Sequence, residues 1–153
     1  MLEPIIKTVE VPCDQEKAFT VFLDEMETWW PVEKFTTSKM SGSSVKTIKV
    51  DSKVGGKIIE VSEEGTEYLW GEIKTYNPYD VFTMDFHIPG PGWEIGPMSQ
   101  VEVRFTDMGD NRTRVVLTQT DWEALGDMAE DIRGGYNLGW NPILEAFKSK
   151  CGR

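Results

Sequence analysis

Residues 128–147, MAEDIRGGYNLGWNPILEAF, decide the fold. Large apolar side chains recur here every three or four residues, which is typical of one face of an amphipathic helix. The side chains of this face are Met128, Ile132, Tyr136, Trp140, Ile143, Leu144 and Phe147. The stretch therefore predicts a long C-terminal helix whose apolar face must pack against another layer of the protein.

The residues before this helix predict the layer on which it packs. Between Val45 and Trp122, short alternating segments are separated by turn signals such as the Gly-Gly pair at 55–56 and NPYD at 77–80. The segments are VKTIKVD, KIIEV, YLWGEIKTY, VFTMDFHI, SQVEVRFTD and RTRVVLTQTDW. They predict six antiparallel strands in a meander. Alternation within VFTMDFHI places Phe86 on the inward face and His87 on the opposite face, toward solvent.

The N-terminal region predicts one further strand and two short helices. IIKTVEVP (5–12) alternates as a strand, and Asp14 is a candidate N-cap for the helix that follows. Apolar residues then recur at helical spacing from Ala18 to Met26, with a break predicted near Asp24 and an end before Pro31. The polar segment TTSKMSGSS (36–44) is expected to be a loop.

Length and composition set the outer bounds. The 153 residues predict a single domain spanning 1–153, of the α+β class. A net charge of −10 argues against a nucleic-acid partner, and the sequence has no apolar run long enough for membrane insertion. No signal peptide is recognised, so a cytoplasmic location is expected. Cys13 and Cys151 are expected to be free thiols in a reducing cytoplasm, with a disulfide between them as the alternative.

A single helix is narrow against a sheet of six or seven strands, so the gap between the two layers is either filled by large side chains or left as a cavity. Four aromatic residues beside predicted openings are candidates for its lining: Trp30, Trp93, Tyr136 and Trp140. Trp93 lies in the long segment PGPGWEIGP (89–97) between two strands. Trp29 and Trp30 adjoin Pro31, and two interpretations stay open. Either one indole is core and the other caps the helix junction, or Trp30 reaches the mouth of the cavity.

Candidates for catalysis and metal binding are few. His87 is the only histidine, and no cluster of His, Cys and carboxylate residues has the spacing of a metal site. Glu72 and Asp121 are the carboxylates closest to the predicted cavity, but Glu72 is expected to point outward. The sequence therefore predicts no catalytic residue, no metal and no cofactor.

Five segments together resemble a known family: TWWP, VGGKIIE, LWGEIKTYNPYDVFTMDF, TRVVLTQTDWE and LGWNPILEAFK. Their order and spacing are similar to the activator of heat-shock-protein ATPase homologue-like branch of the START/Bet v 1-like (SRPBCC) superfamily. The resemblance implies a helix-grip fold, in which a curved antiparallel sheet wraps around the long C-terminal helix and encloses an apolar pocket. The family pattern often has a histidine in the seventh strand, where this sequence has Gln119.

These observations favour a protein that binds an apolar or amphipathic small molecule between sheet and helix. The predicted ligand-binding residues are Trp30, Phe86, Trp93, Gln119, Tyr136 and Trp140. One alternative is a protein-interaction or co-chaperone-like module, for which the acidic segment EALGDMAEDI (123–132) offers a docking surface for a basic partner. The other is an enzyme of the cyclase or dehydratase type, which occurs elsewhere in the superfamily.

Overall fold

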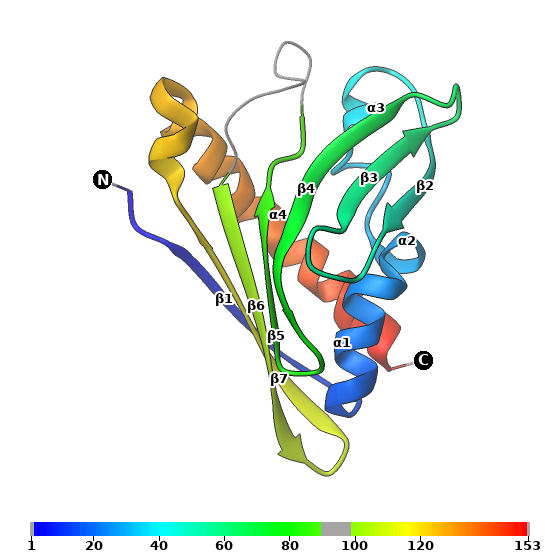
Figure 1. The fold of residues 1–153 in the computed structure, drawn as a ribbon, viewed down its shortest axis with the longest axis vertical. Helices are drawn as coiled ribbons and strands as arrows, with labels where there is room; N and C mark the ends of the chain where they lie inside the picture. The colour runs from blue at the N-terminus through cyan, green and yellow to red at the C-terminus, as the bar shows by residue number, and fades with distance from the viewer. Residues whose placement is uncertain (1, 90–98, 153) are drawn as a thin grey trace.

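The computed structural model describes residues 2–89 and 99–152, and their elements follow the predicted order (Figure 1). The strands are β1 (Ile5–Val11), β2 (Val45–Val50), β3 (Lys57–Ser62), β4 (Glu67–Asn77), β5 (Val81–Phe86), β6 (Ser99–Gly109) and β7 (Arg112–Thr120). The helices are α1 (Gln15–Asp24), α2 (Met26–Trp29), α3 (Thr37–Met40), the 3₁₀ helix η1 (Trp122–Met128) and α4 (Ala129–Cys151). No helix in these described ranges is long and apolar enough to cross a membrane.

The strands form one seven-stranded sheet in the order β1-β7-β6-β5-β4-β3-β2. Every neighbouring pair is antiparallel, so β2 to β7 form the predicted meander and β1 joins the far edge beside β7. Register shifts interrupt the β2–β3, β3–β4, β4–β5 and β6–β7 pairs. Because such bulges bend and twist strands, the sheet curls, and α4 crosses its concave side (Figure 1). The predicted helix-grip fold is confirmed.

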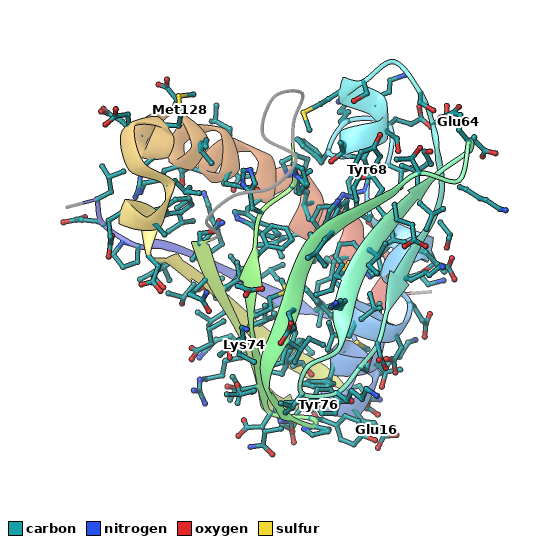
Figure 2. The ribbon with its side chains drawn as sticks, turned by 45° about the horizontal axis from the view of Figure 1, so that its top comes forward. Glu16, Glu64, Tyr68, Lys74, Tyr76 and Met128 are labelled. Carbon is teal, nitrogen blue, oxygen red and sulfur yellow. The ribbon has the colours of Figure 1, made fainter. Side chains whose placement is uncertain are left out.

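The C-terminal part of α4 supplies the centre of the core. Trp140, Ile143, Leu144 and Phe147 are buried, as the helical spacing predicted. They face buried side chains of the sheet, which are Phe82, Met84, Val103, Phe105, Val115 and Leu117. Side chains from both layers thus occupy the space that looks open between the ribbons (Figure 2). Nearer the start of α4, Ile132 and Tyr136 are only partly buried, so the packing there is incomplete.

Two short helices follow β1 as predicted. The carboxylate of Asp14 caps α1 by accepting a hydrogen bond from the backbone N–H of Lys17 at 2.8 Å. The chain then breaks between Asp24 and Met26, where α2 begins. The start of α1 lies close to the C-terminal end of α4 (Figure 1).

Trp29 and Trp30 are both buried, which neither sequence interpretation described in full. Trp29 ends α2, and Trp30 has φ −59° and ψ 132°, which is not helical, so the chain direction changes between the two indoles. The Trp29 indole N–H donates to the Val21 carbonyl at 2.7 Å, and that of Trp30 donates to the Phe35 carbonyl at 2.8 Å. The helix end thus lets adjacent side chains enter the same core from different directions.

The segment predicted as a polar loop contains a single helical turn, α3. Thr36 caps it by accepting a hydrogen bond from the Lys39 N–H at 3.3 Å. The N–H groups of Thr37 and Ser38 donate to the carboxylate of Glu60 in β3. The prediction failed here because the turn has no apolar period of its own and depends on this contact with the sheet.

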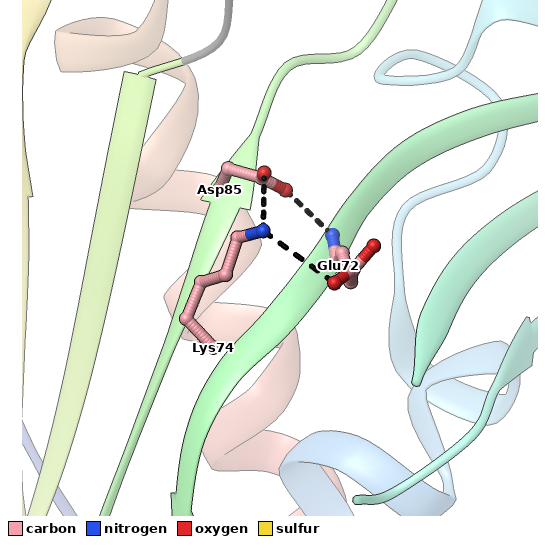
Figure 3. A network of polar contacts seen from close by, with 3 residues as sticks. All are labelled: Glu72, Lys74 and Asp85. Atoms are coloured by element: carbon pink, nitrogen blue, oxygen red, sulfur yellow. Dashed lines mark hydrogen bonds and ion pairs between the residues drawn. The ribbon is translucent and has the colours of Figure 1, made fainter. Parts of the chain in front are cut away.

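The outer face of the sheet is polar. Lys74 of β4 lies 3.4 Å from both Glu72 and Asp85, and the Glu72 N–H donates to Asp85 at 2.7 Å (Figure 3). The negative charge of Asp85 raises the pKa of Lys74. The prediction that Glu72 points outward is confirmed, and Asp121 is also exposed. Neither carboxylate faces the space between the sheet and α4.

Candidate functional site

A cavity of about 300 Å³ lies where the packing of α4 is incomplete. It is bounded by the N-terminal half of α4, by the segment that connects α2 to α3, and by the residues just after β5. Its lining residues are Lys34, Phe35, Met40, His87, Ile88, Asp131, Ile132, Gly135, Tyr136, Gly139 and Ile143. Most of these side chains are apolar, and the two charged ones, Lys34 and Asp131, are exposed to solvent.

Glycines in α4 create part of this space. Gly135 and Gly139 are four residues apart, so they lie on the same face of the helix. A Cβ added to Gly139 would come within 3.3 Å of the Phe35 ring, so this glycine lets the ring pack closely on the helix backbone. A Cβ added to Gly135 would meet nothing within 4 Å. The helix backbone itself therefore forms one wall of the cavity.

His87 and Tyr136 form the polar part of the lining. The Tyr136 hydroxyl accepts a hydrogen bond from the Ile88 N–H at 2.8 Å and lies 3.4 Å from Nδ1 of His87. Burial lowers the pKa of His87, so the imidazole is neutral at pH 7, and burial raises the pKa of Tyr136, so the phenol stays protonated. The Tyr136 hydroxyl can donate to Nδ1 of His87 or accept from it, and the tautomer of the imidazole decides which.

The predicted orientation of His87 was wrong. Its side chain is 6% exposed and lines the cavity, whereas alternation placed it toward solvent. The reason is that β5 ends at Phe86, so the strand period no longer applies to the next residue. The backbone N–H of His87 still donates to the Trp70 carbonyl at 2.8 Å, and this contact keeps the residue beside the sheet.

Of the six residues predicted to bind a ligand, Tyr136 lines the cavity directly. Trp30, Phe86 and Trp140 lie behind it in the aromatic core: the Tyr136 ring centroid is 6.3 Å from that of Trp140 and 5.9 Å from that of Phe86. Trp30 contacts Trp140 in turn, with a centroid distance of 6.0 Å. Trp93 lies outside the described residues. A role in binding for these side chains stays a prediction.

Gln119 belongs to a buried chain of hydrogen bonds. Its Oε1 accepts from the Trp140 indole N–H at 2.8 Å, and its Nε2 donates to the Ser99 hydroxyl at 2.8 Å. The Ser99 hydroxyl donates to the Phe86 carbonyl, also at 2.8 Å. Gln119 therefore fixes the rotamer of Trp140, and through it the ring against which Tyr136 stacks.

Sequence reasoning missed Glu60, which anchors one wall of the cavity. This carboxylate is fully buried, and it accepts hydrogen bonds from the Thr37 N–H at 2.8 Å, the Ser38 N–H at 2.6 Å and the Trp70 indole at 3.0 Å. It thereby holds the α3 turn, and the adjoining segment that carries Phe35, against the sheet. The signal was present, because strand alternation puts Glu60 on the same face as the inward-pointing Ile58.

The α3 turn is also tied to the opposite wall, because the Thr37 hydroxyl donates a hydrogen bond to the Pro89 carbonyl, one residue beyond Ile88. Within residues 2–89 and 99–152, no group of three or more His, Cys, Asp and Glu side chains is arranged to hold a metal ion. The site thus consists of an apolar space, one neutral histidine–tyrosine pair and a charged mouth.

An antiparallel sheet curled around one long helix, with an apolar cavity beside that helix, defines the helix-grip class of proteins. The sequence profile of the family described as Activator of Hsp90 ATPase homolog 1-like protein matches residues 12–151. The chain therefore belongs to this family, which confirms the resemblance of its motifs. No curated protein matches the sequence.

Solved structures with the same fold include proteins with different activities. CalC, a self-sacrificing resistance protein from Micromonospora echinospora, is 26% identical with a TM-score of 0.68, covering 97% of this chain and 93% of CalC. The anthrahydroquino-γ-pyrone synthase Txn09, complexed with SUM, is 25% identical with a TM-score of 0.64, covering 97% and 96%. An HSP90 activator from Plasmodium falciparum, at 20% identity, a TM-score of 0.66 and coverage of 97% and 96%, shares the fold alone.

Proposed function

We propose that the protein binds a small, mostly apolar molecule in the cavity beside Gly135 and Tyr136. The cavity itself carries this proposal, because its volume of about 300 Å³ falls at the lower end of the range for ligand pockets. Burial of apolar ligand surface against Phe35, Ile132 and Ile143 would supply the driving force.

The polar residues favour a ligand with one hydrogen-bonding group on an otherwise apolar body. His87 and Tyr136 are both uncharged at pH 7, so they offer hydrogen bonds without the cost of burying a charge. Lys34 and Asp131 stand at the exposed edge, where an amphipathic ligand would keep its polar end. The predicted residues Trp30, Phe86, Gln119 and Trp140 would act by holding the Tyr136 wall in place.

The similar proteins support a ligand-binding role. Txn09 is described as an anthrahydroquino-γ-pyrone synthase complexed with SUM, and it is similar to this chain over nearly the whole of both chains. We further propose that the protein acts as a single domain in the cytoplasm, where its two cysteines stay reduced.

A paired substitution on α4 tests the proposal. Titration with the fluorescent amphipathic probe anilinonaphthalenesulfonate, an aromatic body with one sulfonate group, should give saturable binding to the wild-type protein. Ile132→Asp places a charge in the lining, and we expect it to weaken binding by at least about tenfold. Leu138→Asp makes the same chemical change at a residue that is 72% exposed and outside the lining, and it should change affinity by less than about threefold.

Equal losses in the two variants, in proteins whose circular dichroism matches the wild type, would contradict binding in this cavity. Native mass spectrometry of freshly purified protein gives an independent measurement. A co-purified small molecule that is present in the wild type and depleted in Ile132→Asp would identify the natural ligand.

A co-chaperone-like role is the second candidate, and it is favoured by the exposed surface around η1 and the start of α4. Met128 is 38% exposed there (Figure 2), and Glu123, Asp127 and Glu130 are exposed nearby. An apolar side chain among carboxylates suits a partner with a basic rim. The ATPase rate of an Hsp90-type chaperone, measured with and without this protein, tests the role, and an unchanged rate would count against it.

An enzymatic role of the cyclase or dehydratase type is the third candidate. The observation that favours it is the neutral His87 imidazole beside the Tyr136 hydroxyl, since such a pair can accept and donate protons. It predicts that a ligand found by mass spectrometry is chemically altered on incubation with the wild type and not with His87→Gln.

A further inference from the structure

Three glycines lie within α4: Gly134, Gly135 and Gly139. Glycine in the interior of a helix is destabilising relative to alanine, because it loses more backbone freedom on folding. All three sit inside one helix that the fold needs for its core. Their presence therefore calls for a reason at each position.

The three glycines differ in what an added Cβ atom would meet. Gly139 has a packing reason within the protein itself, because a Cβ there would lie 3.3 Å from the Phe35 ring and the ring would have to move. Gly134 and Gly135 have no such packing reason, since a Cβ at either would meet no atom within 4 Å. Of these two, only Gly135 lines the cavity. The side chain that Gly135 lacks corresponds to open cavity space.

We infer that Gly135 is a specificity-determining residue, whose bare backbone forms the seat for the ligand and sets the largest ligand that the cavity admits. This inference rests on the proposed ligand-binding function. Ile132 precedes Gly135 by nearly one helical turn and Gly139 follows by four residues, so ligand atoms at this seat would contact the helix backbone between them. A Cβ at residue 135 would meet no atom within 4 Å, so a side chain there would extend from the helix into the cavity space.

The adjacent glycine offers a matched control. Gly134→Leu and Gly135→Leu introduce the same side chain into the same helix, and each is free of steric clash at its Cβ. Both variants are expected to fold, since leucine is a better helix former than glycine. Gly135→Ala provides a milder change at the seat. Thermal melting of all variants checks that their folded state is retained.

Two probes of different size measure the effect. We expect Gly135→Leu to weaken the binding of anilinonaphthalenesulfonate by at least about tenfold. The affinity for the smaller molecule naphthol should fall by less than about threefold. Gly134→Leu should leave both affinities within about threefold of the wild type, and Gly135→Ala should fall between. Equal effects at residues 134 and 135, or an unchanged affinity of both probes in Gly135→Leu, would overturn the inference. A wild-type protein that binds neither probe would instead overturn the proposed function, and the inference with it.

Discussion

At the scale of single residues, His87 determines how the cavity responds to pH. Its imidazole is neutral because burial opposes the charged form, and burial is the cause of its lowered pKa. A neutral imidazole also spares an apolar ligand the free-energy cost of covering a charged group and removing it from water. The cavity therefore has its most apolar character at neutral and alkaline pH.

We predict that His87 makes the protein less stable in acid. Its pKa is 6.5 in the unfolded chain and lower in the folded protein, so the unfolded chain binds more protons as the pH falls below 6.5. The loss of stability is absent well above pH 6.5. Below pH 6.5 the free energy of unfolding falls by at most about 1.4 kcal/mol per pH unit on account of His87. Urea unfolding of wild type and His87→Gln from about pH 8 to about pH 5 measures it. Parallel stability curves for the two proteins would contradict the prediction.

Glu60 is a second residue whose environment fixes its role. Each donor that faces it is an N–H group, so the carboxylate is matched to its site. Glu60→Gln retains the shape of the side chain but turns an NH₂ group toward at least one of these donors. The free energy of unfolding should fall by about 1–3 kcal/mol. Glu64→Gln, at an exposed residue just after the same strand, should cost clearly less. Urea melts compare the two, and equal losses would mean that Glu60 does not anchor the α3 turn.

The difference between Glu60 and His87 explains what the sequence predicts at this scale. Alternation could identify Glu60 as a carboxylate on an apolar face, but it could not identify its donors. Two of them come from the distant α3 turn, and the third is an indole on the neighbouring strand β4. His87 was assigned to the wrong face because the exact end of β5 decides its direction. The choice among the aromatic candidates depended on side-chain packing, which leaves Tyr136 in the lining and Trp140 behind it.

At the scale of elements, α4 has two parts with different tasks. Its C-terminal part fills the core, whereas its N-terminal part leaves the cavity open. The apolar period predicted the whole helix, but it could not distinguish a packed side chain from one beside an empty space. That distinction depends on the glycines and on Phe35, which comes from another segment.

We predict that Trp140→Ala destabilises the protein more than Leu144→Ala. Leu144→Ala should cost about 2–5 kcal/mol, as expected for a buried leucine. Trp140 is fully buried and its indole N–H satisfies Gln119, so truncation creates a larger cavity and leaves an acceptor without its donor. Truncating a tryptophan that lines a cavity would destabilise the protein less than truncating one in the packed core. Denaturant melts of both variants therefore show whether Trp140 belongs to the core. A smaller loss for Trp140→Ala would indicate that the space around it is not fully packed.

Substitution of two of the glycines in α4 should increase the stability of the protein, whereas the two truncations above decrease it. Gly134→Ala and Gly135→Ala should each raise the free energy of unfolding by about 0.5–1 kcal/mol, because alanine restricts the unfolded chain and no atom obstructs the added Cβ. Gly139→Ala should give no such gain, since the Phe35 ring must move by a few tenths of an ångström. Thermal unfolding of the three variants measures the order. A gain at Gly139 equal to the others would show that Phe35 yields freely.

At the scale of the whole molecule, the connection between β1 and α1 meets the C-terminal end of α4. Cys13 lies between β1 and α1, and Cys151 ends α4, yet both are buried and their thiols are in hydrogen-bond contact. A Cβ at Gly152 would lie 3.4 Å from the Pro12 ring, which brings the two segments together at a further point. The order of strands and helices predicted from sequence brings α4 across the sheet, but the meeting of these particular residues follows only from the folded lengths of the elements.

The paired thiols give a measurement of how cooperatively the molecule opens. Burial raises the pKa of both Cys13 and Cys151, so neither forms the reactive thiolate readily in the folded state. We expect iodoacetamide to modify both slowly under native conditions and rapidly in denaturant, with peptide mass spectrometry reporting each site. Because each thiol is covered by the other's segment, opening one should expose both, and their native rates should agree within about threefold. Much faster modification of Cys151 would show that the last turn of α4 opens independently of the sheet, and the contact between the β1–α1 connection and the end of α4 would then be local rather than part of the global fold.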